Sequence, residues 1–70
     1  MSPADLLDDP VLHRVCCGSA VAIPPQYRQR MIAAGLVEWR GRADGGADPH
    51  PNAAANDLAA EASRLAGWVL

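Results

Sequence analysis

Proline placement divides this chain into short segments. Pro3 directly follows Ser2, and Pro10 directly follows Asp9. Ser and Asp side chains accept hydrogen bonds from the first N–H groups of a helix, and proline suits the first helical position. The two pairs therefore predict helix starts at residues 3 and 10. The double proline at 24–25 predicts a further break, followed by another helix start.

The first two segments are short. We expect a helical turn over residues 3–8, and then a helix from Pro10 to about Cys17 that ends at Gly18. Three residues of the second helix recur at spacings of 3 and 4 and so share one face, as a buried stripe requires. They are Leu12, Val15 and Cys16.

The middle of the chain predicts a strand, a helix and a second strand. Residues 20–23 are short and apolar, and a helix follows from Pro25 to Ala34, with Gly35 as its C-terminal stop. Residues 36–40 then alternate as a strand, with Val37 and Trp39 on one side and Leu36, Glu38 and Arg40 on the other. The next stretch, 41–51, is dense in Gly, Asp and Pro, which predicts a loop.

The helix from Pro25 is expected to be amphipathic. Tyr27, Met31 and Ala34 fall on its apolar face, while Arg28 lies beside Ile32 at the boundary. The opposite, polar face is composed of Gln26, Gln29, Arg30 and Ala33.

The last segment shows the clearest helical period. It starts near Asn52 or Asn56, either of which suits an N-cap, and runs to Val69. Its apolar residues recur at 4, 3 and 4 positions and are Leu58, Ala62, Leu65 and Val69.

These segments predict a mainly α fold: one domain over residues 1–70, with three helices and a short two-stranded β element formed by 20–23 and 36–40. A chain of 70 residues buries only about 60% of its unfolded surface. Phe is absent, so the expected core is thin. We expect Trp39 in that core and Trp68 in the core or in a dimer contact. A homodimer through the C-terminal helix would supply further buried area.

Charge is unevenly spread along the chain. The net charge is −2, but residues 13–42 carry five arginines against the single carboxylate of Glu38. All six basic residues are Arg, and Ala and Gly are abundant, which is typical of a GC-rich genome and indicates a bacterial or phage origin. The N-terminus is acidic where a signal peptide would be basic, and no apolar run approaches the roughly 20 residues of a membrane span. We expect a cytoplasmic protein.

The stretch MIAAGLVEWRGRADGG resembles the back half of a winged-helix domain. In that family the recognition helix ends at a Gly, an apolar strand follows, and a basic Gly-rich hairpin forms the wing. The resemblance covers about residues 12–46. It implies DNA binding, with Gln26, Gln29 and Arg30 facing the groove and Arg40 and Arg42 touching phosphates.

Other chemistry has weak support in the sequence. His13, Cys16 and Cys17 lie within one helical turn, but zinc needs a fourth ligand and only His50 remains, so we expect no metal and no cofactor. A Cys–His pair without a third, orienting group does not make a catalytic site, and we expect no enzyme. The PPQY stretch at 24–27 is interpreted as a helix start rather than a ligand for a polyproline-binding domain.

Two functions remain open. The first is a small protein-binding regulator or inhibitor, encoded by a phage or mobile element and acting as a dimer. The second is a winged-helix-like DNA-binding regulator of transcription. Both would use nearly the same contact residues, which are Arg28, Arg30, Arg40, Arg42, Trp39, Gln26 and Gln29.

Overall fold

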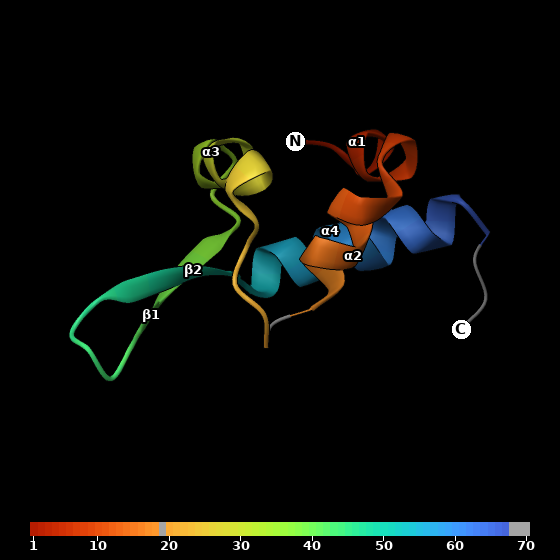
Figure 1. Cartoon of the computed structure of the whole chain (residues 1–70). Coiled ribbons are helices and arrows are strands. Elements are labelled where there is room, and N and C mark those ends of the chain that lie inside the picture. The colour runs from red at the N-terminus through yellow and green to blue at the C-terminus, as the bar shows by residue number, and fades with distance from the viewer. Residues whose placement is uncertain (19, 68–70) are drawn as a thin grey trace.

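The computed structural model describes residues 1–18 and 20–67. This part of the chain is mostly helical and holds four helices and one two-stranded antiparallel sheet (Figure 1). The elements follow the order α1 (Pro3–Asp8), α2 (Pro10–Cys17), α3 (Pro25–Ala33), β1 (Val37–Gly41), β2 (Ala47–Pro51) and α4 (Ala53–Leu65).

The helix starts predicted from Ser2 and Asp9 are confirmed. The Asp9 carboxylate accepts hydrogen bonds from the backbone N–H groups of Val11 and Leu12, at 3.1 and 3.2 Å. The backbone N–H of Ser2 donates to the Asp5 carboxylate at 2.8 Å, and this bond is the main cause that lowers the Asp5 pKa. Because α1 is a separate helix, the described chain has four helices where three were predicted.

The core lies where α4 crosses α1 and α2. Small residues on α4 are fully or almost fully buried and allow this close approach. Large side chains from the other segments fill the space around them. The buried apolar set is Leu6, Leu12, Cys16, Ile23, Met31, Leu36, Ala55, Ala59 and Ala62.

Two asparagines fix the position of α4. Asn52 is its N-cap and accepts the backbone N–H of Ala55 at 3.0 Å. Asn56, the other candidate cap, instead donates its side-chain amide to the carbonyl of Cys16 at 2.6 Å and so joins α4 to the end of α2. On the predicted stripe of α4, Leu58 is half-buried, Ala62 is buried and Leu65 is 66% exposed, whereas Val69 and Trp68 lie outside the described residues.

The β element differs from the prediction. Residues 41–51 were expected to be a loop, but Ala47–Pro51 form β2, which pairs antiparallel with β1. Residues 20–23 are not a strand; the Ile23 N–H donates one bond to the Pro49 carbonyl at 2.8 Å, beside β2 rather than β1. The hairpin extends away from the helices, with α3 at its base (Figure 1).

Within residues 1–18 and 20–67, no helix is long and apolar enough to cross a membrane.

Candidate functional site

The backbone register of the hairpin explains how β2 tolerates two prolines. The Pro49 carbonyl accepts its bond from Ile23 and therefore points away from β1, so Trp39 and Pro49 form a pair without ladder hydrogen bonds. The two types of pair alternate along an antiparallel ladder, so Val37 and Pro51 also form a pair without ladder hydrogen bonds. Proline lacks an N–H, and at these positions that N–H would point away from β1. The ladder therefore loses no donor.

One face of the hairpin is charged. Glu38 and Arg40 are two residues apart on β1, and the Arg40 guanidinium donates to the Glu38 carboxylate at 2.8 Å. Across the ladder, Glu38 is opposite His50 and Arg40 is opposite Asp48. The predicted placement of Glu38 and Arg40 on one side of the strand is confirmed.

Arg42 is held at the hairpin tip by two carboxylates. Its Nε donates to Asp44 at 3.1 Å and its Nη1 donates to Asp48 at 2.8 Å, and both contacts raise the Arg42 pKa. The Asp44 carboxylate also accepts the Gly46 N–H at 2.9 Å, which is the main cause that lowers the Asp44 pKa. A Cβ at Gly46 would overlap the Arg42 guanidinium. The tip thus has one guanidinium against two carboxylates and is not a basic cluster.

Trp39 lies on the other face of β1, outside the core in which it was predicted. It was expected in the core but is 58% exposed. Its cross-strand partner Pro49 is buried, as is Pro51, which lies opposite Val37. The prolines and Val37, which is partly buried, face the body of the protein, while much of the indole remains open to solvent.

The polar face of α3 has the predicted composition. Gln26, Gln29 and Arg30 are all exposed, and no carboxylate of the described chain forms a salt bridge with Arg30. Met31 is buried and Tyr27 partly buried, which confirms the apolar face.

Arg28 differs from the other candidate arginines. Its side chain is partly buried, and its Nε is buried without a hydrogen-bond partner among the described atoms. The predicted residues therefore form two groups: α3 at the base of the hairpin, and β1 with the tip beyond it (Figure 1).

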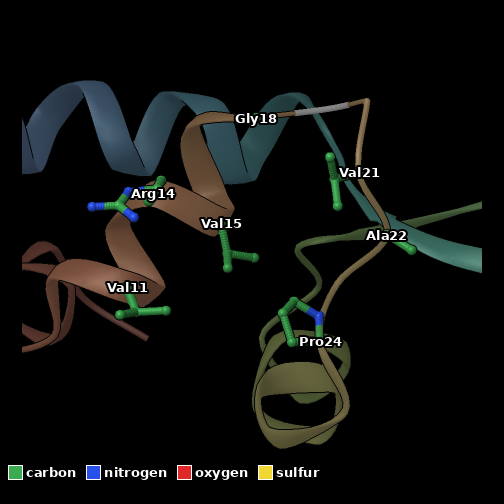
Figure 2. Close-up of a pocket in the computed structure, with 7 residues that line it drawn as sticks. All are labelled: Val11, Arg14, Val15, Gly18, Val21, Ala22 and Pro24. Carbon is green, nitrogen blue, oxygen red and sulfur yellow. The ribbon is translucent and has the colours of Figure 1, made fainter.

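An apolar pocket of about 340 Å³ separates α2 from the segment that leads into α3 (Figure 2). Arg14, near the end of α2, is the one charged side chain in its lining, and Val21 at its edge is 78% exposed. The remaining lining residues are Val11, Val15, Gly18, Ala22 and Pro24. The pocket can accept an apolar group of a ligand, and Arg14 can pair with an anionic group of the same ligand.

His13 contacts two groups that the sequence does not indicate. Its Nε2 lies 3.1 Å from the Ala59 carbonyl and 2.9 Å from the Ser63 hydroxyl. The Ser63 hydroxyl also donates to that carbonyl, at 3.0 Å. On the other side of the ring, Nδ1 lies 3.6 Å from the Cys17 sulfur. Both partners of Nε2 lie on α4, which no local sequence pattern indicates.

The two cysteines have different environments. Cys16 is fully buried, and burial raises the pKa of its thiol to about 11. Cys17 is exposed, and both thiols are free. No group of three His, Cys, Asp or Glu side chains in the described segments could hold a metal ion.

Comparison of the chain with protein-family models, curated proteins and solved structures gave no match.

Proposed function

We propose that this chain is a small, non-enzymatic protein-binding module that regulates or inhibits its partner. The observation that carries the proposal is the 58% exposure of Trp39 on a hairpin that extends away from the helices. Exposing an indole to water is unfavourable, and Trp is enriched among the residues that contribute most to protein interfaces. A partner that covers Trp39 would remove this surface from water.

The charges around Trp39 favour a protein over a nucleic acid as the partner. Arg40 and Arg42 are each paired with carboxylates of the same hairpin. A phosphate backbone would have to displace these carboxylates and would meet their repulsion. A protein surface of mixed charge can instead bind these arginine–carboxylate ion pairs without breaking them.

The test uses the tagged wild-type chain, three variants of it and extracts of the source cell. Trp39→Ala should lose a partner that the wild-type chain captures, and Arg30→Ala/Arg40→Ala should weaken its capture. Leu65→Ala is the matched control, because Leu65 is an apolar residue on α4 with a similar exposed fraction, 66%. Capture that is unchanged by Trp39→Ala would contradict the proposal. Far-UV circular dichroism verifies that each variant is folded.

A second candidate function is DNA binding of the winged-helix kind. The observation in its favour is the exposed row of Gln26, Gln29 and Arg30 on α3, followed along the chain by a hairpin in the place of a wing. Its test is the affinity for a generic DNA duplex measured by fluorescence anisotropy. A DNA-binding protein should bind tightly at low salt and lose affinity steeply as salt rises. A protein-binding module should leave the duplex unbound at about 100 mM salt.

A further inference from the structure

The outer edge of β1 has backbone groups available for another strand. Since Trp39 and Pro49 form a pair without ladder bonds, the N–H and C=O of Trp39 point away from β2. The same alternation applies to Val37 and Gly41, each two residues away. The described chain also has backbone hydrogen bonds outside its helices and the β1–β2 ladder. In none of them is one of these three N–H groups the donor. An open edge of this kind is a template for strand addition.

The other edge of the sheet does not offer the same template. On β2 the outward positions include Pro49 and Pro51, which have no N–H to donate. The Pro49 carbonyl is also occupied by the Ile23 N–H. Strand addition is therefore directed to β1 alone.

The sequence of β1 is complementary to itself in the antiparallel direction. With Trp39 opposite Trp39 of a second copy, Glu38 lies opposite Arg40 of that copy, and Arg40 opposite its Glu38. Val37 and Gly41 then face each other, and no like charges meet. Opposite charges in cross-strand positions stabilise a sheet, whereas like charges destabilise it. A two-fold symmetric contact requires this kind of self-complementarity.

We propose that two copies of this chain associate through their β1 strands to form a continuous four-stranded antiparallel sheet. The outward groups of Val37, Trp39 and Gly41 form the new ladder. Both Trp39 side chains then lie next to each other on one face, and the Glu38 and Arg40 side chains of both copies form one network on the other. This inference goes beyond the proposed partner-binding function. It is tested on the purified chain, without any other protein.

The decisive experiment exchanges the two charges. Sedimentation equilibrium of the wild-type chain should show a weak dimer, with a dissociation constant on the order of 100 µM, because five-residue strands bury little area. Glu38→Arg places arginine opposite arginine, and Arg40→Glu places glutamate opposite glutamate. Each variant alone should associate at least about tenfold more weakly. An equimolar mixture of the two should form a heterodimer, and the double variant Glu38→Arg/Arg40→Glu should recover the homodimer.

Proline substitutions test the backbone contact separately. Gly41→Pro removes an outward N–H of β1 and leaves the inner ladder intact, so it should weaken the dimer. Its matched control is Ala47→Pro, at the residue opposite Gly41, whose N–H points to the other edge of the sheet. This control should leave the dimer unchanged, and circular dichroism verifies the fold of both.

A direct readout covers the case in which a variant fails to fold. In the dimer, Glu38 and Arg40 of the second copy form a pair without ladder bonds, with Cα atoms about 4.5 Å apart. A mixed labelled sample of wild-type chains should therefore give an intermolecular nuclear Overhauser effect between their Hα protons. A chain that stays monomeric at about 1 mM would overturn the proposal. So would a dimer that is indifferent to both charge exchange and Gly41→Pro, because its contact would lie elsewhere, for example on α4.

Discussion

The side-chain amide of Asn52 donates a hydrogen bond to the carbonyl of Gly35, 3.0 Å away. The backbone N–H of Asn52 donates to the carbonyl of Leu36, and its side-chain oxygen caps α4 through the Ala55 N–H. One residue thus joins the turn after α3, the base of the hairpin and the start of α4. This junction determines how the exposed hairpin is oriented relative to the helices.

Substitutions of Asn52 should separate the stability that comes from capping α4 from the stability that comes from the hydrogen bond to Gly35. Asn52→Ala loses both side-chain bonds and should lower the free energy of unfolding by about 1–3 kcal/mol. Asn52→Asp keeps the capping oxygen but has no amide to donate to Gly35, so its loss should be smaller. Urea denaturation followed by circular dichroism measures both. Equal losses in the two variants would show that the cap contributes little.

The hydroxyl of Tyr27 provides a second link, because it donates to the Asp9 carboxylate at 3.2 Å. This contact connects α3 to the junction between α1 and α2, and both burial and the Asp9 carboxylate raise the Tyr27 pKa. Tyr27→Phe should lower the melting temperature by a few degrees. Asp9→Ala should lower it further, because the α2 cap is lost with the link. If the Tyr27→Phe variant has the same melting temperature as the wild type, the hydrogen bond from Tyr27 to Asp9 does not stabilise the fold.

Burial of Cys16 should make stability depend on alkaline pH. Its thiol pKa rises from 9.0 to about 11, chiefly through desolvation. The folded state therefore holds this proton more tightly than the unfolded state, and stability is full below about pH 9. It should fall by on the order of 2 kcal/mol as pH rises towards 11. Cys16→Ala should reduce this fall relative to the wild type, whereas Cys17→Ser should leave it in place. Denaturant midpoints at pH 8, 9, 10 and 11 give the comparison.

Cys17 should react first with a thiol reagent under native conditions, because it is exposed while Cys16 is buried. The His13 Nδ1 lies 3.6 Å from its sulfur and can take up the thiol proton. We expect His13→Ala to slow this reaction several-fold near pH 7. Cys17→Ser should leave one thiol that reacts only slowly. Mass spectrometry of the alkylated chain identifies the site, and faster labelling of Cys16 would refute the assignment.

Local signals in the sequence predicted where the helices lie, although α1 was expected only as a helical turn. The range predicted for α2 from Asp9, Pro10 and Gly18 is confirmed, and α3 ends one residue earlier than predicted. These elements depend on caps and periodicity within a few residues, which a single sequence contains.

The hairpin could not be predicted in the same way. Residues 47–51 read Ala-Asp-Pro-His-Pro, and Asp and Pro are depleted in strands. They form β2 because each proline falls at an outward position, which depends on pairing with β1. The exposure of Trp39 has the same origin, since the hairpin carries it away from the α-helical core.

The spacing of the two prolines limits how the turn between β1 and β2 can change in length. Residues 42 and 46 close the turn through the bond from the Arg42 N–H to the Gly46 carbonyl, and Gly45 between them has a φ of 90°. A one-residue insertion or deletion there would shift the pairing by one residue. Pro49 and Pro51 would then occupy inward positions, where two ladder donors would be missing, and their rings would move to the charged face. Natural variants of this chain that keep both prolines should therefore differ in turn length by even numbers of residues.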